Sequence, residues 1–119
     1  MIKGIGIDII ELERIGRSVK RQKRFVQRIL TEKELEHYQS LPKERRKIEF
    51  IAGRFAAKEA LAKATGRGIG ALSFQHIEIL PKRGGAPGID VKGYKAGQIH
   101  LSISHSEHYA VAQVIIEGD

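Results

Sequence analysis

An aspartate near the start of the chain and a glutamate–lysine pair in its middle are well suited to phosphate chemistry. Asp8 follows Gly4-Ile5-Gly6-Ile7, where two glycines allow a ligand to approach the backbone closely. Glu59 and Lys63 are four residues apart, so they lie on one face of a helix. A carboxylate in such a place can hold a cation while the ammonium group meets a phosphate oxygen. The alternatives are an acid at a strand end and a solvated surface ion pair.

A second polar group, Ser104-His105-Ser106, combines two hydroxyl groups with an imidazole and suits an oxyanion. A serine hydrolase would need a Gly-x-Ser-x-Gly turn, which the sequence lacks. A zinc site would need His100, His105 and His108 to converge. His100 and His105 are an odd number of residues apart, however, so they would face opposite sides of a strand, and the chain has no cysteine. The alternative to oxyanion binding is a structural histidine in a turn.

The third feature is a strongly basic segment. Between Glu13 and Arg28 the chain has seven basic residues and one acidic residue, so this segment holds nearly all of the net charge of +7. If the segment is one continuous helix, its arginines fall within an arc of roughly 80°. They are Arg14, Arg17, Arg21, Arg24 and Arg28, with Phe25 and Val26 as apolar neighbours. The pattern favours a docking surface for an acidic partner, with a solvated charged face as the alternative.

Helices and strands must position these groups. The predicted elements are a strand over 2–10, helices over 12–29, from Thr31, and from 40 to 65, and strands over 75–80, 89–91, 99–103 and 108–116. Thr31 and Glu34 have the spacing of a capping box, and Gly16 is a possible break in the first helix. Pro42 suits the first turn of the long helix, and Gly66 suits its end.

This order of elements predicts an α+β fold in which an antiparallel β-sheet packs with a long helix and shorter helices. The last two strands form a hairpin, because only a few polar residues around Ser104–Glu107 separate them. A chain of 119 residues suits a single domain over 1–119.

The composition excludes several classes of protein. The absence of cysteine rules out a disulfide scaffold and a thiolate zinc site. With 41% hydrophobic and 29% charged residues, the chain is not of the disordered class. The apolar start is broken by charge and is too short for a signal peptide or a membrane span, so a cytoplasmic protein is expected.

Three runs, taken together, resemble the holo-acyl-carrier-protein synthases, the small bacterial 4′-phosphopantetheinyl transferases. The runs are Gly4–Ile9, Phe50–Ala60, and Leu101–Ser106 followed by Tyr109–Ala112. Their order and the length of the chain make the resemblance specific, and it covers essentially the whole sequence. It implies the 4′-phosphopantetheinyl transferase fold, assembled as a homotrimer with active sites between subunits.

The resemblance implies transfer of 4′-phosphopantetheine from coenzyme A to a serine of an apo acyl carrier protein, with release of adenosine 3′,5′-bisphosphate, in fatty acid biosynthesis. It also implies Mg²⁺ on the pyrophosphate, held by the acids that match Asp8 and Glu59. The chemistry agrees, because Mg²⁺ prefers carboxylate and phosphate oxygens. The general base stays open between Glu59 and a metal-bound water.

The resemblance assigns further roles residue by residue. Lys63 joins Asp8 and Glu59 as a catalytic residue and contacts the pyrophosphate. The residues expected at the nucleotide of coenzyme A are Arg54, Lys63, Ser104, His105 and Ser106. The residues expected to dock the acidic carrier protein are Arg14, Arg21, Arg24, Phe25 and Arg28. Neither nucleic acid nor a membrane is expected as a partner.

One departure and two rival functions stand beside this interpretation. Many relatives in the wider superfamily have a Gly-Lys-Pro turn whose lysine helps to bind coenzyme A. Here the turn is Gly85-Ala86-Pro87, so Lys82 or Arg83 replaces that lysine or the contact is absent.

A nucleic-acid-binding module would fit the net charge, but four Phe, three Tyr and no Trp offer few stacking surfaces. A structural trimer without activity is the other rival.

Overall fold

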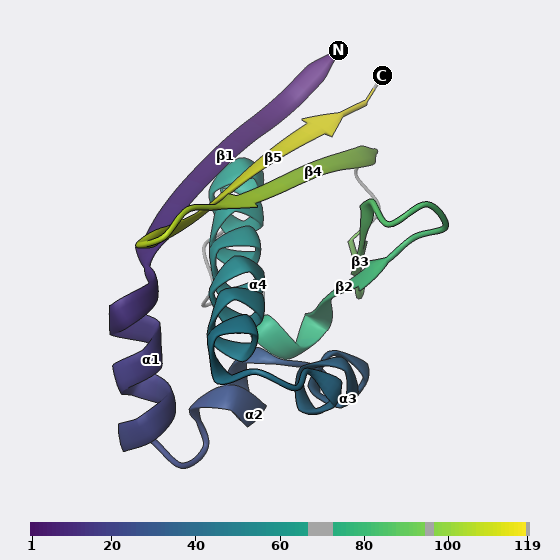
Figure 1. The fold of residues 1–119 in the computed structure, drawn as a ribbon. Coiled ribbons are helices and arrows are strands. Elements are labelled where there is room, and N and C mark those ends of the chain that lie inside the picture. The colour runs from purple at the N-terminus through teal and green to yellow at the C-terminus, as the bar shows by residue number, and fades with distance from the viewer. Residues whose placement is uncertain (67–72, 95–96, 119) are drawn as a thin grey trace.

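Figure 1 shows the chain in a computed structural model, which describes residues 1–66, 73–94 and 97–118. The elements are β1 (Ile2–Glu11), α1 (Leu12–Arg21), α2 (Phe25–Ile29), α3 (Glu32–Ser40), α4 (Glu44–Thr65), the 3-10 turn η1 (Phe74–His76), β2 (Ile77–Pro81), β3 (Pro87–Val91), β4 (Gln98–His105) and β5 (Tyr109–Glu117). The long helix α4 packs against β1, β4 and β5, and the shorter helices gather around its first half. The predicted α+β fold is confirmed.

The strands divide into two antiparallel sheets. In the larger sheet β5 lies between β1 and β4, and the predicted β4–β5 hairpin is present. Within the described residues β2 and β3 pair only with each other, so the expectation of one sheet is wrong. The free edge of β2 is covered by side chains instead of a strand. There the N–H of Ile79 donates to Glu34, and its carbonyl accepts from Arg54.

β1 and α4 meet backbone to backbone, and two glycines make this contact possible. A Cβ on Gly6 would lie 1.8 Å from the carbonyl oxygen of Ala60, and one on Gly4 would lie 2.0 Å from that of Ala64. Any side chain at these positions would push the helix off the strand. The expectation that the glycines admit a ligand is therefore wrong. They admit α4, and Asp8 follows on the same face of β1.

The basic segment forms two helices, α1 and α2, with a break at Gln22, which has an extended backbone. In one continuous helix Phe25 would lie within about 20° of Arg14, on the charged arc. The break turns Phe25 inward, where it is buried and stacks on Phe55 of α4 with the ring centroids 6.3 Å apart. The predicted single helix and its single arc of arginines are therefore wrong, and the chain does not break at Gly16.

Capping residues mark the start of α3 and the end of α4. Both bonds of the capping box between Thr31 and Glu34 are present, as predicted. α4 ends where Gly66 adopts a φ of 73°, also as predicted. The helix begins later than expected, because Lys43 still has an extended backbone. Pro42 lies in the connection from α3, where it disfavours a helical conformation of the residue before it.

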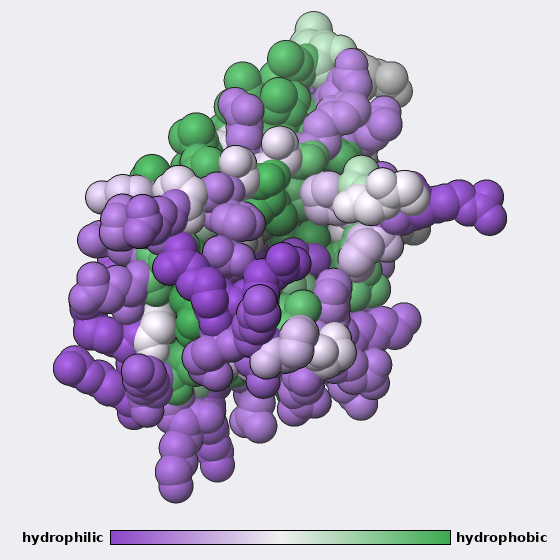
Figure 2. Space-filling model, in the orientation of Figure 1, coloured by the Kyte–Doolittle hydropathy of each residue, from purple (hydrophilic) through white to green (hydrophobic). Residues whose placement is uncertain are grey.

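The larger sheet has one covered face and one open face. Ala112, Val114 and Ile116 of β5 are buried beneath α4. On the opposite face Ile5, Ile7 and Ile9 of β1 are 56%, 56% and 62% exposed. Figure 2 shows apolar residues, in green, along the upper left, where β1 lies in Figure 1. A contiguous apolar strip of this kind is typical of a surface that another protein covers.

The two ends of the described chain lie side by side. The ammonium group of Met1 donates to the carbonyl of Gly118 at 2.9 Å, and the N–H of Gly118 donates to the carbonyl of Met1 at 2.8 Å. Figure 1 shows both ends at the top, whereas α1 and α2 lie at the bottom. Over residues 1–66, 73–94 and 97–118, no helix is long and apolar enough to cross a membrane.

Candidate functional site

Asp8, Glu59 and Lys63 form one cluster where α4 crosses β1. Lys63 Nζ donates to Asp8 Oδ1 at 3.1 Å and to the carbonyl oxygen of Ile7 at 2.9 Å. Glu59 lies one turn before Lys63 on the same helix face. The close contact at Gly6 determines this arrangement, because it brings the next inward residue of β1 beside α4. The structure thus brings together the three residues that the sequence predicted as catalytic.

The two carboxylates of this cluster influence each other. Burial raises the pKa of Glu59 above its ordinary value, the charge of Asp8 raises it further, and Lys63 lowers it. A cation bound between the two acids would relieve this repulsion. No group of three or more His, Asp or Glu side chains in the described part of the chain could hold a metal by itself. Two carboxylates completed by phosphate oxygens and water are nevertheless a set that Mg²⁺ accepts, so the residues fit this ion.

A second cluster lines a pocket of about 260 Å³ against the first half of α4. Its polar lining includes Arg46, Glu49 and Arg54 of α4, His37 of α3 and His105 of β4. The Glu49 carboxylate lies 3.7 Å from His105 Nδ1 and 3.9 Å from Arg46 Nε. Because the basic groups outnumber the single carboxylate, the pocket suits an anionic ligand.

Arg54 has unused bonding capacity at this pocket. Its guanidinium lies over the Phe50 ring, 4.1 Å from the centroid, and Nη2 donates to the carbonyl of Ile79 at 3.4 Å. Arg54 Nε is buried and has no hydrogen-bond partner among the described residues. Burial also lowers the pKa of Arg54, against the opposing influence of Glu34. A bound anion would satisfy the nitrogen and stabilise the charge.

Ser104, His105 and Ser106 do not share one surface within the chain, and their predicted role at the nucleotide stays a prediction. Ser104 and His105 are neighbours on β4 and therefore face opposite sides of the sheet. Ser106 Oγ accepts the N–H of Tyr109 at 3.2 Å and closes the β4–β5 turn. Of the three, His105 lines the pocket. His100 lies on the other face of β4, as its parity predicted.

The β2–β3 turn adjoins the same pocket through Pro81 and Gly85. Lys82 and Arg83, the candidates for the missing turn lysine, are both exposed there. The side chain of Lys82 lies back over Gly88, since a Cβ on that glycine would be 2.7 Å from Lys82 Cε. Neither cation is among the residues that line the pocket, and their roles stay predictions.

The two clusters lie toward opposite edges of the larger sheet. α4 crosses this sheet obliquely, so that Gly53 is nearest Ile103 of β4 and Ala60 is nearest Gly6 of β1. β1 and β4 are the edge strands, with β5 between them. The chain therefore places the Asp8 cluster at one edge and the His105 pocket at the other.

The arginines predicted to dock a partner are exposed on α1, on α2 and between them: Arg14, Arg21, Arg24 and Arg28. Arg17 differs from them, because it pairs with Glu13 on α1 at 3.2 Å. Phe25 does not share their surface. It is 9% exposed and supports the arginines from beneath, so the expectation that it is an exposed apolar anchor is wrong.

Sequence reasoning missed a fully buried ion pair between Lys58 and Glu34. Lys58 Nζ lies 2.6 Å from Glu34 Oε1, and Glu34 Oε2 accepts the N–H of Ile79 at 2.8 Å. Burial lowers the pKa of Lys58, and the Glu34 carboxylate opposes this by raising it. The sequence held a signal, because Lys58 is seven residues after Ile51 and three before Leu61, which puts it on the apolar helix face.

Comparison with known proteins shows the family to which this chain belongs. The family model of the 4′-phosphopantetheinyl transferase superfamily matches residues 4–114. The chain belongs to this superfamily. Within it, a holo-[acyl-carrier-protein] synthase of Oceanobacillus iheyensis is 58% identical over 98% of both chains. One of Bacillus subtilis is 55% identical over 98% of this chain and 97% of its own.

A solved structure extends the comparison to three dimensions. The holo-(acyl-carrier-protein) synthase of Bacillus anthracis, in complex with CoA (3′,5′-ADP), has a TM-score of 0.90 and 48% identity. The match covers 100% of this chain and 99% of the other. The resemblance predicted from the three sequence runs is confirmed, and this phosphopantetheinyl transferase is an enzyme of the holo-[acyl-carrier-protein] synthase family.

Proposed function

We propose that the chain transfers 4′-phosphopantetheine from coenzyme A to a serine of an apo acyl carrier protein and releases adenosine 3′,5′-bisphosphate. The names of the relatives and the coenzyme A complex of one of them support this reaction. The observation that carries the proposal is the cluster of Asp8, Glu59 and Lys63, which unites two mutually repelling carboxylates with an ammonium group.

Asp8 and Glu59 would hold Mg²⁺, which supplies charge neutralisation on the pyrophosphate when it is bound. Lys63 has three donors and a side chain that is 56% exposed, so it can turn from Asp8 to a phosphate oxygen. Arg54 and His105 would bind the nucleotide end of coenzyme A, where the unpaired Nε of Arg54 gains an acceptor.

We further propose that the enzyme works as a homotrimer with active sites between subunits. Two observations support this arrangement. The Asp8 cluster and the His105 pocket lie toward opposite edges of one sheet, where a neighbouring chain could contribute to either of them. The exposed strip of Ile5, Ile7 and Ile9 offers the apolar surface that such an assembly would bury.

The arginines of α1 and α2 would dock the carrier protein. Acyl carrier proteins are acidic, and a concentrated positive surface steers a negative partner into place. The fatty acid pathway and a cytoplasmic location complete the proposal, and both follow from the resemblance and the composition rather than from the fold.

The reaction is tested by intact-protein mass spectrometry of an apo carrier protein incubated with coenzyme A, Mg²⁺ and the enzyme. We expect the carrier to gain one phosphopantetheine group, and Asp8→Ala or Glu59→Ala to abolish the gain while the circular dichroism spectrum is retained. No gain with the unmodified enzyme would refute the proposed reaction. Full activity of either variant would remove that acid from the metal site.

The docking surface is tested by reversing charge at Arg14 and Arg21 together. Arg14→Glu with Arg21→Glu should raise KM for the carrier by about tenfold or more and leave KM for coenzyme A unchanged, because only the carrier meets this surface. The effect should shrink at high salt. The matched control is Arg17→Glu, since Arg17 is already paired with Glu13 on the same helix. An equal rise in KM for the carrier and for coenzyme A would show that the arginines bind the nucleotide instead.

A further inference from the structure

α2 is a five-residue helix and is too short to be stable by itself. Its inner side is fixed by burial of Phe25 and Ile29. Its exposed side carries Arg28, whose N–H donates to the carbonyl of Arg24 at 2.9 Å. The last carbonyls of a helix have no partner within the helix, so another part of the chain has to satisfy them.

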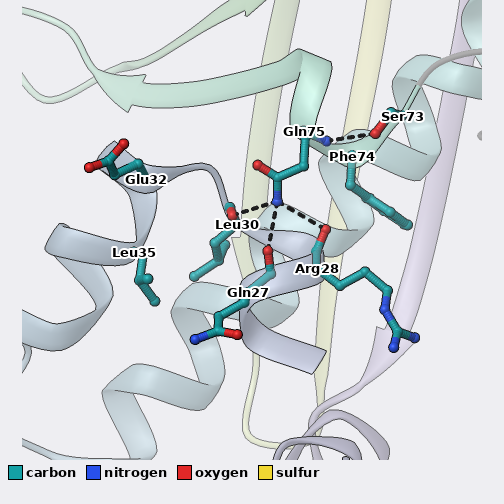
Figure 3. A pocket seen from close by; sticks show the side chains of 8 residues that line it. All are labelled: Gln27, Arg28, Leu30, Glu32, Leu35, Ser73, Phe74 and Gln75. Carbon is teal, nitrogen blue, oxygen red and sulfur yellow. Dashed lines mark hydrogen bonds between the residues drawn. The ribbon is translucent and has the colours of Figure 1, made fainter. Parts of the chain in front are cut away.

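Gln75 of η1 provides this partner. Its Nε2 lies 2.7 Å from the carbonyl oxygen of Gln27, 3.2 Å from that of Arg28 and 2.8 Å from that of Leu30. Figure 3 shows the three bonds converging on one amide nitrogen. This nitrogen carries two hydrogens, so one of them is shared between two carbonyls. The N–H of Gln75 donates to Ser73 Oγ at 3.2 Å, which fixes the start of the side chain.

Lys58 binds the carbonyl of Ile29, the one carbonyl of residues 27–30 that Gln75 does not bind. Its buried Nζ donates to the carbonyl of Ile29 at 2.7 Å and to the carbonyl of Phe74 at 3.1 Å. The four consecutive carbonyls of residues 27–30 are thus held by two side chains from other elements. Lys58 joins α2 to η1 from the inside, and Gln75 closes the end of the helix from the outside.

We propose that Gln75 is a positioning residue for the carrier protein. By holding the C-terminal end of α2, it fixes the direction from which Arg28 meets the carrier. Figure 3 shows the Arg28 side chain extending away from the Gln75 carboxamide, so Gln75 acts through the backbone of α2 and not through the arginine head group. Without the carboxamide the end of the helix frays, and binding then has to order it again. The inference rests on the proposed docking of an acidic carrier on these arginines.

The test compares Gln75→Met with Gln39→Met, the same change at an exposed glutamine of α3. Methionine keeps the length of glutamine, adds no charge and removes both donors. In Gln75→Met we expect faster amide hydrogen exchange over residues 25–30 and a KM for the carrier raised about three- to tenfold, with KM for coenzyme A unchanged. Gln39→Met should change neither. Unchanged exchange in Gln75→Met, or equal rises in both KM values, would overturn the inference.

Arg28→Ala separates a failure of this inference from a failure of the docking proposal. If Arg28→Ala raises KM for the carrier and Gln75→Met does not, Gln75 has no positioning role. If neither raises it, the carrier does not dock on α2 and both ideas fail together, while faster exchange would still show that Gln75 holds the helix. The double variant should be no worse than Arg28→Ala alone, because Gln75 acts through Arg28. Additive losses would contradict this dependence.

Discussion

At the scale of single residues, folding changes the acidity of Glu59. It lies on α4 near Asp8 of β1, and both burial and that neighbouring charge disfavour its ionised form. A carboxyl whose pKa is raised by folding contributes most to stability below its unfolded pKa and loses that contribution as pH rises through the folded pKa. The metal-free enzyme should therefore become less stable, through Glu59, as pH rises above about 4.3, the ordinary pKa of glutamate.

Asp8→Asn tests this coupling. The change removes the repelling charge, so the pKa of Glu59 should fall toward its ordinary value, with the part due to burial remaining. Lys63→Met should do the reverse and raise it, because Lys63 favours the ionised form. Both shifts are measured by NMR titration of the Glu59 carboxyl carbon in metal-free protein. A Glu59 titration that is identical in all three proteins would contradict the proximity of these groups.

Lys58 and Glu34 are the residues whose importance the sequence least revealed. Glu34 was predicted as part of a capping box, and that bond is present, but its carboxylate also reaches Lys58 and β2. A capping box involves residues three apart, so a sequence pattern can find it. The pair with Lys58 joins residues 24 positions apart, and no local spacing predicts it.

Lys58→Met should destabilise the fold by about 3–5 kcal/mol, because it leaves the Glu34 carboxylate buried without its counter-charge. Adding Glu34→Gln should recover part of this loss, since no unpaired charge then remains. Urea unfolding at neutral pH measures both. If the double variant is less stable than Lys58→Met, the cost does not come from the unpaired charge.

At the scale of elements, the contact between β1 and α4 determines where the cluster of Asp8, Glu59 and Lys63 lies. Prediction located both elements and ended α4 at Gly66, because apolar periodicity and a left-handed glycine are local signals. It misread Gly4 and Gly6, because a glycine that admits a ligand and one that admits a helix look the same in sequence. It also joined α1 to α2, since the burial of Phe25 against Phe55 is a tertiary contact.

Gly6→Ala should separate β1 from α4, because its new methyl group would lie 1.8 Å from the Ala60 carbonyl oxygen. We expect a loss of about 1–3 kcal/mol in the free energy of unfolding, together with a fall in kcat as Asp8 moves away from Glu59. Gly16→Ala is the matched control. The nearest atom to its Cβ is 3.9 Å away, and the change should stabilise α1 by up to about 1 kcal/mol. Equal effects of the two changes on stability would contradict the close packing.

At the scale of the whole molecule, the described residues form two separate polar clusters and an exposed apolar strip on β1. The resemblance implied sites shared between subunits, but no sequence pattern predicted that α4 would place the Asp8 cluster and the His105 pocket toward two edges of a sheet. That separation depends on strand order, which places β5 in the middle and which no single motif encodes. The proposed trimer follows from this geometry and has a direct biochemical test.

Mixing two inactive variants should restore activity if each site joins two chains. Asp8→Ala damages one edge and His105→Ala the other, so a site between them can combine an intact Asp8 with an intact His105. Random exchange into cyclic trimers should restore about one quarter of the sites. The activity of the mixture is compared with that of each variant alone, and sedimentation confirms that the subunits have exchanged. A mixture no more active than the average of its parts would place the complete site within one chain.

Met1 and Gly118, which bind each other through two hydrogen bonds, also determine how the molecule can be attached to a surface. A tether placed at either residue leaves from the same corner, and this corner is remote from α1 and α2 (Figure 1). Immobilised in this way on a sensor chip, the enzyme would turn its arginine-bearing helices toward the flowing solution. The chain is thus oriented for real-time measurement of carrier association, and the choice of terminus for the tag should not change the on-rate.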